Sequence, residues 1–560
     1  MKQTNNAIKF LMAQYRAIFK NAYFKGMATA LVLTAGLAAG AAQAATEGYL
    51  YRNDKWDNSG SSSEYIGKLS AILAGQVAGD ALAYDGNALD ANKQSTTASG
   101  GTLTIGTRTS GAGTQYMKNG AAAGNWAEAS GSGVNVTATS GSVTVNSNGY
   151  VLKDGASGGR GVIYGGRASS LAGSATATYN KVIVKRNADL ATAAASNAIR
   201  GAHAHGFTGA TANNNTVEIY GYTNDDGTTT RQAIAVQGAT DLNAGTAVIA
   251  SVTDDELANA TGKYEASNND ITLTSVIAKS DNKALDFVAG KVGLGIKSKY
   301  ASGAYGVTEN NHFKMTDGII NTSGGYLRAN WITNASGAGT ASIDGKGRGI
   351  EIVDSEISTK DTTTLSLIVN DVDHLGTGTV KADNGHLEIV NTKITGGTLK
   401  LTGADVTTKG VTTSASNNEI SITEKSTNYD STTKTYKQSV NADITGAIVT
   451  NNGTADNLVI TATGNSIDVG SAVSVTGDVV GASVNASGSK IATMSLNDNS
   501  VSVAGKVVGN IKAVSYTNSD TGGSSIDAKK NKLSFLNNDV SLLNGADVSS
   551  GDLVGGAGKD

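Results

Sequence analysis

The chain has 560 residues with 71 Gly, no Pro and no Cys, and charged residues make up 16% of it. The absence of Cys excludes disulfide frameworks, thiolate metal sites and cysteine nucleophiles, and the absence of Pro excludes collagen and polyproline ligands. The low charged fraction does not fit a disordered chain that stays open by self-repulsion.

The N-terminus has the three parts of a secretory signal peptide. Residues 1–25 carry five basic side chains and no acid, an apolar run starts at Met27, and Ala42 and Ala44 form an A-x-A cleavage site. We therefore assign residues 1–44 to a signal peptide, with an N-terminal membrane anchor as the alternative. The apolar run is shorter, and richer in Gly and Ala, than a membrane-spanning helix requires.

Cleavage changes the charge of the protein. It removes five basic residues and leaves 39 basic and 47 acidic residues, a formal charge of −8. A mildly acidic chain lacks the basic footprint of nucleic-acid-binding proteins and the polybasic patch that binds anionic lipid. We expect an exported protein without a nucleic-acid partner.

Residues 45–100 are predicted to form an N-terminal cap region. Ser61-Ser-Ser-Glu64 resembles a helix capping box, and the apolar residues after it follow helical spacing. This pattern predicts a short helix over 61–84, with a loop as the alternative because three glycines interrupt it. A helix here could cover the open end of a repeat stack.

From residue 101 onward the apolar residues alternate with polar ones. Val143-Thr-Val145, Val182-Ile-Val184 and Val217-Glu-Ile219 are typical short runs, and Gly, Asn or Ser bounds each of them. Five Asn-Asn pairs also precede strand-like runs: Asn214 and Asn215, Asn268 and Asn269, Asn310 and Asn311, Asn417 and Asn418, and Asn537 and Asn538. Asn suits left-handed corners, and stacked Asn side chains can form amide ladders between coils.

Internal similarity indicates a repeat architecture. Residues 350–357 recur as 387–394, and 399–406 keep the same apolar positions. Residues 473–481 recur as 501–509. The sequence therefore predicts an all-β fold, a right-handed parallel β-helix (β-solenoid) over 101–560 that follows the short N-terminal helix. At about 20–25 residues per coil, some 400 residues would form about 16–20 coils. β-Sandwich modules, a β-barrel and an irregular chain are the alternatives.

A search for chemistry gives few candidates. His203 and His205 would share one strand face and could be half of a metal site, or an exposed pair on a strand. Asp225-Asp226 and Asp254-Asp255-Glu256 could bind Ca²⁺ or be solvated turns. Gly555–Asp560 matches half of a calcium-binding nonapeptide, or is a Gly-rich coil corner. We assign no metal, cofactor or catalytic residue, and expect no enzymatic activity.

The long basic signal with its aromatic residues, the Asn-Asn-x-Val-x-Ile strands, the Tyr-Gly-Gly segments and the absence of Cys resemble the passenger region of a Gram-negative autotransporter or related adhesin. The resemblance covers most of residues 1–560. It implies export through a secretion translocon to the outer-membrane surface or the extracellular space. It also implies an outer-membrane translocator barrel, outside residues 1–560 or on a separate chain.

The function implied by this resemblance is adhesion, with a host glycan or a surface protein as the ligand. Loops would carry the recognition. The candidate loops are 222–231, 253–267 and 424–437, and Tyr429 and Tyr436 in the last loop could stack on sugars. The alternatives are a surface-layer or matrix structural protein, and a β-helix enzyme that acts on polysaccharides.

Overall fold

The described part of the chain lies in the second of its two compact units, Met1–Thr46 and Glu47–Asp560. The computed structural model describes residues 49–52, 56–58, 61–63, 67–68, 97–105, 115–117, 120–129, 133–145, 149–151, 161–185, 198–223, 229–230, 232–235, 241–250, 262–280, 284–296, 299–300, 303–335, 340–374, 376–424, 438–453, 456–486, 490–518, 532–543, 546–549, 551–555 and 557–559. The predicted signal peptide, with Ala42 and Ala44, lies outside these ranges.

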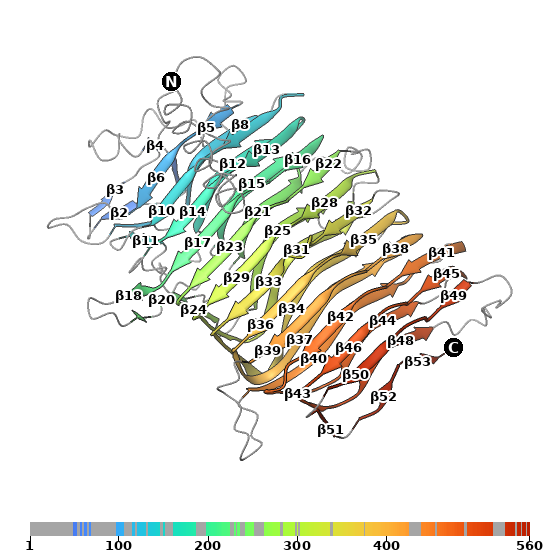
Figure 1. The fold of residues 1–560 in the computed structure, drawn as a ribbon. Helices are drawn as coiled ribbons and strands as arrows, with labels where there is room; N and C mark the ends of the chain where they lie inside the picture. The colour runs from blue at the N-terminus through green and yellow to red at the C-terminus, as the bar shows by residue number, and fades with distance from the viewer. Residues whose placement is uncertain are drawn as a thin grey trace, which may run out of the picture. The chain divides into compact units, whose positions relative to one another are not determined.

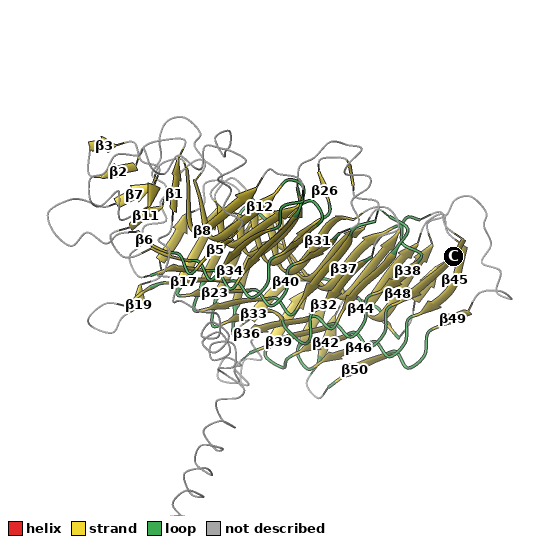
Figure 2. Cartoon of the chain, turned by 90° about the horizontal axis from the view of Figure 1, so that it is seen from above, coloured by secondary structure: helices red, strands yellow, loops and turns green. Residues whose placement is uncertain are grey.

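Every regular element in the described ranges is a β-strand (Figure 2). No helix in those ranges has the length and apolar character needed to cross a membrane. Within the helix predicted over 61–84, the structure describes two short strands, β3 (Ser61–Ser63) and β4 (Gly67–Lys68). These residues therefore do not belong to a helix, and the rest of the predicted helix lies outside the described residues.

Two sheets of twelve short strands run along the stack (Figure 1). We call the first sheet 1: β6 (Thr102–Ile105), β10 (Ser142–Val145), β14 (Lys181–Val184), β17 (Thr216–Tyr220), β23 (Asp270–Thr274), β29 (His312–Thr316), β33 (Gly349–Val353), β36 (His386–Val390), β39 (Glu419–Thr423), β42 (Ser466–Val469), β46 (Ser500–Val503) and β50 (Asp539–Leu542). Sheet 2 contains β5 (Thr97–Ser99), β9 (Val136–Thr139), β13 (Ser174–Thr178), β16 (Gly209–Thr211), β22 (Lys263–Glu265), β28 (Tyr305–Glu309), β32 (Ala341–Asp344), β35 (Thr379–Asp383), β38 (Thr412–Ser414), β41 (Asp456–Thr461), β45 (Lys490–Ser495) and β49 (Lys532–Ser534).

Sheet 3 has longer strands. Its main row contains β8 (Gly120–Ala129), β12 (Gly161–Ser170), β15 (Ala198–Gly206), β21 (Asp241–Ile249), β25 (Leu285–Gly293), β31 (Gly325–Ala335), β34 (Glu356–His374), β37 (Lys393–Thr408), β40 (Gln438–Asn451), β44 (Val479–Ala486) and β48 (Ile511–Asn518). A companion row of short strands, β20 (Gln232–Ala235), β24 (Val276–Ser280), β30 (Ile319–Thr322), β43 (Val473–Thr476), β47 (Lys506–Val508) and β51 (Asp547–Ser549), lies beside it. In β34, β37 and β40 the two rows merge into one strand of 14 to 19 residues.

The remaining strands are peripheral. The ends of sheet 3 carry β1 (Tyr49–Arg52), β4, β52 (Leu553–Val554) and β53 (Ala557–Lys559). A small four-stranded sheet contains β2 (Trp56–Asn58), β3, β7 (Gln115–Met117) and β11 (Gly149–Val151). Two hairpins join β18 (Tyr222–Thr223) to β19 (Thr229–Thr230) and β26 (Gly295–Ile296) to β27 (Lys299–Tyr300).

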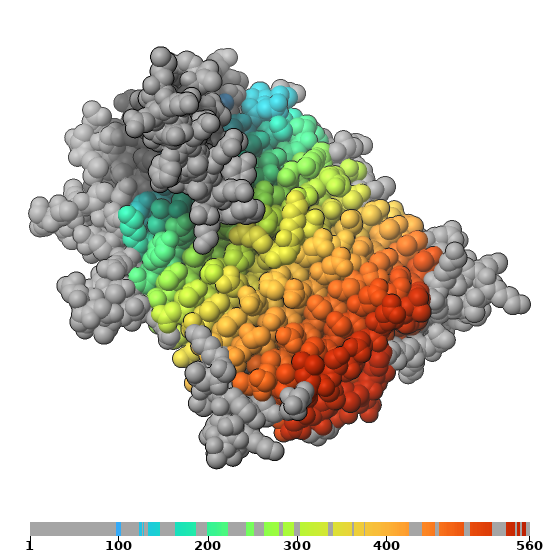
Figure 3. All heavy atoms as spheres, viewed as in Figure 1, coloured from blue at the N-terminus to red at the C-terminus, as the bar shows by residue number. Residues whose placement is uncertain are grey.

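Apart from β1 and β4, whose pairings are antiparallel, strands of the three long sheets pair in parallel, one coil on the next. Val143 of β10, for example, lies between Leu103 of β6 and Val182 of β14. Successive coils follow one another in chain order, as the parallel bands of Figure 3 show. This arrangement confirms the predicted parallel β-helix.

The coils are longer and fewer than the sequence suggested. Equivalent corner residues lie 33 residues apart between Gly385 and Asn418, and 54 apart between Asn215 and Asn269. Within the described residues sheets 1 and 2 each contain twelve strands, fewer than the 16–20 coils predicted. The estimate failed because each coil adds a long sheet 3 strand, and often a loop, to its two short strands.

The interior of the β-helix contains two separate apolar columns. One packs sheet 1 against the first half of sheet 3 and is rich in Val, Ile, Leu and Phe, with Phe287 and Phe313 stacked at 6.1 Å. The other packs sheet 2 against the second half of sheet 3 and contains mostly Ala in its N-terminal coils. Alternation along each strand sends these side chains inward.

A column of buried Asn side chains separates the two apolar columns. Nine hydrogen bonds of 2.7–3.2 Å, each from Nδ2 of one Asn to Oδ1 of the next, connect Asn180, Asn215, Asn269, Asn311, Asn330, Asn370, Asn418, Asn465, Asn499 and Asn538. We call this column the Asn ladder. Because nearly every amide is buried, these bonds supply partners that water cannot.

Two members of the Asn ladder come from sheet 3 instead of a corner. Where the corner between sheets 2 and 1 holds Gly385 in place of Asn, Asn370 of β34 fills the space and bonds to Asn418 at 3.0 Å. Asn330 of β31 connects Asn311 to Asn370 in the same way. The ladder therefore remains continuous although the corner sequence changes.

Glycines on sheet 3 make room for the Asn ladder. A Cβ at Gly245 would overlap the side-chain amide of Asn269. We expect Gly245→Ala to displace this amide and to lower the free energy of unfolding by about 2–3 kcal/mol, measured by chemical denaturation.

Gly347→Ala is the matched control for Gly245→Ala. Gly347 has a φ of 73°, and no heavy atom lies within 4 Å of the position that a Cβ would occupy. Ala at this position therefore costs only the strain of its backbone conformation, about 1 kcal/mol. Equal losses in the two variants would contradict a steric role for Gly245.

Candidate functional site

The predicted Asn pairs all lie at the corner between sheets 2 and 1. In each pair the first residue has a positive φ of 53–59° and the second belongs to the Asn ladder: Asn214 and Asn215, Asn268 and Asn269, Asn310 and Asn311, Asn417 and Asn418, Asn537 and Asn538. The left-handed conformation turns the chain, and the buried amide ties it to the next coil.

The other predicted positions fall mostly outside the described ranges. These include Asp225-Asp226, Asp254-Asp255-Glu256, Tyr429, Tyr436 and most of the three candidate loops. Within Gly555–Asp560, β53 pairs with β48, which makes it a strand at the end of sheet 3. No group of three or more His, Asp or Glu side chains in the described residues could hold a metal ion.

His203 and His205 share one face of β15, and their rings lie 6.0 Å apart. Their neighbours are cationic and aromatic: Arg200 donates towards Nδ1 of His203 at 3.2 Å, and Tyr164 lies 6.0 Å from the His203 ring. Burial lowers the pKa of His203 well below its ordinary value, and Arg200 and Arg167 lower it further. A neutral imidazole among arginines stabilises this face without adding charge.

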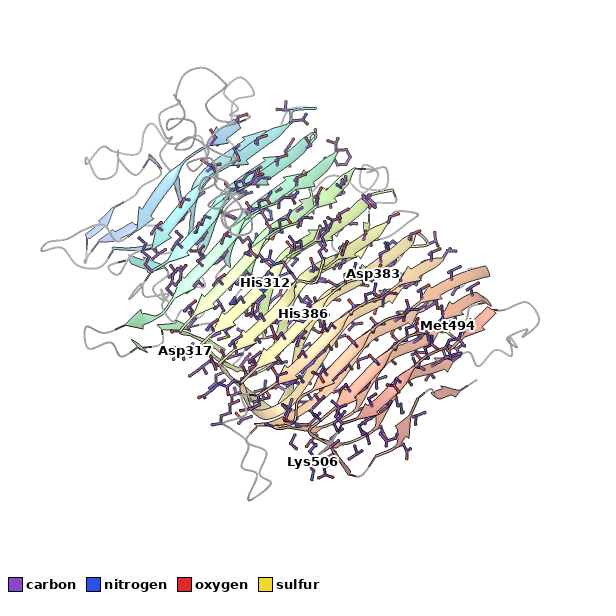
Figure 4. The ribbon with its side chains drawn as sticks, viewed as in Figure 1. His312, Asp317, Asp383, His386, Met494 and Lys506 are labelled. Atoms are coloured by element: carbon purple, nitrogen blue, oxygen red, sulfur yellow. The ribbon has the colours of Figure 1, made fainter. Side chains whose placement is uncertain are left out.

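Sheet 1 carries a row of ionisable side chains that includes His312 and His386 (Figure 4). Arg348 bonds to Asp270 at 2.6 Å and approaches Nδ1 of His312 at 3.1 Å. Burial lowers the pKa of His312 to about 4, and Arg348 contributes to the same shift. These pairs link neighbouring coils on the outer face, and His312 is neutral at physiological pH.

Among the described residues, a dense set of aromatic and charged contacts lies on the outer face of sheet 3. We call it the Arg328 cluster, and it consists of Asp286, Tyr326, Arg328, Trp331, Asp371 and Asp405. Tyr326, Arg328 and Trp331 come from β31, which pairs with β25 on one side and β34 on the other. Trp331, Asp371 and Asp405 are register partners on three successive strands.

A local break in alternation positions these side chains. Ala329 and Asn330 are consecutive and both fully buried, so β31 turns two neighbouring side chains inward at this point. Arg328 and Trp331 therefore lie on either side of the break and both face outward. The Asn ladder holds Asn330, which fixes the place of the break under the cluster.

Arg328 is the centre of the cluster. Its guanidinium bonds to Asp286 at 3.0 Å through Nη1 and to Asp371 through Nε. The same group lies 3.8 Å from the ring centroid of Tyr326 and 4.2 Å from that of Trp331. Only 7% of the Arg328 side chain is exposed, so these contacts hold the charge in one orientation.

The carboxyl groups of the cluster differ in their surroundings. Burial raises the pKa of Asp371, and the neighbouring Arg328 guanidinium offsets part of that rise. Burial also raises the pKa of Asp405 to about 7, and the neighbouring Asp371 raises it further. Among the described residues Asp405 forms no hydrogen bond or ion pair, so its carboxyl is partly protonated at neutral pH.

We expect Asp405→Asn to stabilise the protein at high pH. The wild-type carboxyl has a raised folded pKa, so its contribution to stability is full below the unfolded value of about 3.8 and is lost as pH rises towards 7. The variant should therefore raise the free energy of unfolding by about 2–3 kcal/mol at pH 8 and by little at pH 4. Denaturation curves at the two pH values measure this difference.

No sequence pattern points to the Arg328 cluster. Tyr326, Arg328 and Trp331 lie on one strand, but the three carboxyl groups come from three other strands, and only the strand register brings these to β31. The corner Asn at 180, 465 and 499 were also missed, because a residue other than Asn precedes each of them. A search for a single Asn before an alternating run would have found those three.

Comparisons with known proteins assign no family. No protein-family model matches the chain, and no curated protein matches it.

Proposed function

We propose that the protein is an exported, adhesin-like β-solenoid of the outer-membrane surface or extracellular space, and that it binds a host or neighbouring cell without catalysing a reaction. The observation that carries the proposal is the outer face of sheet 3. There the Arg328 cluster holds Tyr326 and Trp331 in place on a scaffold whose interior is tied together by the Asn ladder. Ordered aromatic and charged side chains on a rigid support suit recognition.

The signal sequence and the resemblance to autotransporter passengers support export. The partners proposed for that step are a secretion translocon and an outer-membrane translocator barrel. A host glycan or surface protein is the proposed ligand, and the formal charge of −8 disfavours nucleic acid.

Binding of the exported, purified protein to epithelial cells and to Gram-negative cells tests the proposal. We expect saturable binding that unlabelled protein competes away. Ordered self-assembly without cell binding would instead support a surface-layer or matrix protein.

A second candidate is a polysaccharide-acting enzyme on the same fold. Asp371 and Asp405 favour it, because they are in-register carboxyl groups on neighbouring strands and glycoside hydrolysis uses two such groups. Depolymerisation of a glycan panel, abolished in Asp371→Asn, would establish the enzyme and overturn the non-enzymatic proposal.

A further inference from the structure

We propose that the Arg328 cluster binds a neutral saccharide chain. This inference rests on the proposed adhesin function, for which it specifies the class of ligand and the binding site. The cluster combines an exposed aromatic ring with fixed donors and acceptors. Tyr326 is 43% exposed, whereas its neighbour Arg328 is almost fully covered. One ring face of Tyr326 rests on the guanidinium, and the exposed part of the ring is available to the C–H face of a sugar.

The polar groups beside Tyr326 suit sugar hydroxyls. Arg328 and Asp371 form a held donor–acceptor pair, and a hydroxyl can both donate and accept. Asp405 adds a carboxyl group that has no hydrogen bond or ion pair among the described residues and is partly accessible to solvent. A carboxyl that is partly protonated offers both a donor and an acceptor to a vicinal diol.

The charge of the cluster selects against acidic ligands. Two carboxyl groups, from Asp286 and Asp371, bond to the one guanidinium, and the carboxyl groups of Asp405 and Asp373 lie near Asp371. Lys291 stacks on Trp331 at 4.1 Å, and Lys400 acts on Asp405, so at least two further cations adjoin the cluster. A sulfated, sialylated or uronate-containing chain would therefore meet net negative charge.

The sheet geometry favours a chain-like ligand bound by side chains. β31, β34 and β37 are each paired on both edges, so no strand edge is free to add a peptide strand at this site. The row from Lys291 through Trp331 and Asp371 to Asp405 crosses four strands, about 14 Å at three strand spacings. This length suits several consecutive sugar rings.

Direct binding measurements with the exported protein test the inference. The probes are neutral linear oligosaccharides (maltohexaose, cellohexaose, mannohexaose and chitohexaose) and the acidic chains polygalacturonate and heparin. We expect at least one neutral probe to bind saturably and to change Trp fluorescence, and the acidic probes to bind at least 10-fold more weakly.

Variants locate the binding. Tyr326→Ala should weaken the neutral probe at least 10-fold and leave the melting temperature within the range of wild type, since Asp286 and Asp371 still hold the Arg328 guanidinium. Tyr305→Ala, at a 37% exposed Tyr on β28 of sheet 2, is the matched control and should bind as wild type does. Asp405→Asn should remove any change in affinity between pH 5 and pH 8.

Several outcomes would overturn the inference. These are preference for an acidic probe, unchanged affinity in Tyr326→Ala, equal losses in Tyr305→Ala and Tyr326→Ala, or cleavage of the bound probe. The proposed adhesin function has a separate test. Failure of the wild-type protein to bind cells would overturn that function. If wild type binds no saccharide but Tyr326→Ala still binds cells, only the saccharide inference is overturned.

Discussion

Replacement of Asn465 by Ala is expected to lower the free energy of unfolding by about 3–6 kcal/mol, among the largest effects of any single substitution in this protein. Asn465 is fully buried in the Asn ladder. Its Oδ1 accepts from the backbone N–H and from Nδ2 of Asn418, both at 3.0 Å. Its Nδ2 donates to Ala415 O at 3.0 Å and to Asn499 Oδ1 at 2.9 Å.

The size of this effect follows from what the substitution leaves behind. Two donors of Asn418 and the carbonyl of Ala415 lose a partner in a place that water cannot reach, and each such loss costs about 1–3 kcal/mol. In a solenoid each coil contacts only its neighbours, so the loss is local. Hydrogen exchange should therefore report faster opening of β39, β42 and β46, with little change in β10 and β14.

Two further variants separate hydrogen bonding from packing. Asn465→Asp keeps the shape but loses both donors, and we expect it to be at least as destabilising as Asn465→Ala at neutral pH. Asn310→Gly replaces a corner Asn on the solvent side, where φ is 53°, and should cost less than about 1 kcal/mol. A mild Asn465→Asp variant would show that the loss comes from the cavity and not from the amide.

The fold could be predicted because the information is local. Alternation of apolar residues identifies short strands, and an Asn pair before a strand identifies a left-handed corner. The pairing register between coils could not be predicted in the same way. Every face of the β-helix buries alternate side chains, so strands from different faces look alike in sequence. Residues 350–357 and 387–394 do stack, with Ile350 beside Leu387.

Other repeats proved to be similarities between different faces. Residues 399–406 resemble 387–394 but lie in β37 of sheet 3 and not in sheet 1. Val473 lies in β43 of the companion row, whereas Val501, its match in sequence, lies in β46 of sheet 1. Residues 233–235 lie in β20 of the companion row, and β21 takes the place beside β15 in the main row. Loops of different length between the strands also hide the true number of residues per coil.

The Arg328 cluster shows the same limit more sharply. Its side chains come from four strands of sheet 3, and their meeting depends on register and on the break at Ala329 and Asn330. The loops that we expect to carry recognition lie mostly outside the described residues, and within the described residues a dense set of aromatic and charged contacts lies on a sheet face. Neither the register nor the break has a signal within a short window of sequence.

Replacement of Arg328 by Met is expected to lower the free energy of unfolding by about 3–5 kcal/mol near pH 8, because it leaves Asp286 and Asp371 without their shared cation. Burial already raises the pKa of Asp371, and removal of the guanidinium raises it further. A carboxyl with a raised folded pKa stabilises the protein below its unfolded pKa and loses that contribution as pH rises. The deficit of the variant should therefore shrink as pH falls from 8 to 4.

Neutralising the carboxyl tests whether charge is the cause of that deficit. Addition of Asp371→Asn to the Arg328→Met background should recover part of the loss at pH 8 and almost none at pH 4, because Asp371 is then already protonated. A double-mutant cycle from denaturation curves at both pH values gives the coupling between the two residues. If the deficit is the same at every pH and Asp371→Asn restores nothing, Arg328 acts through its packing on Tyr326 and Trp331, and the ion pairs add no net stability.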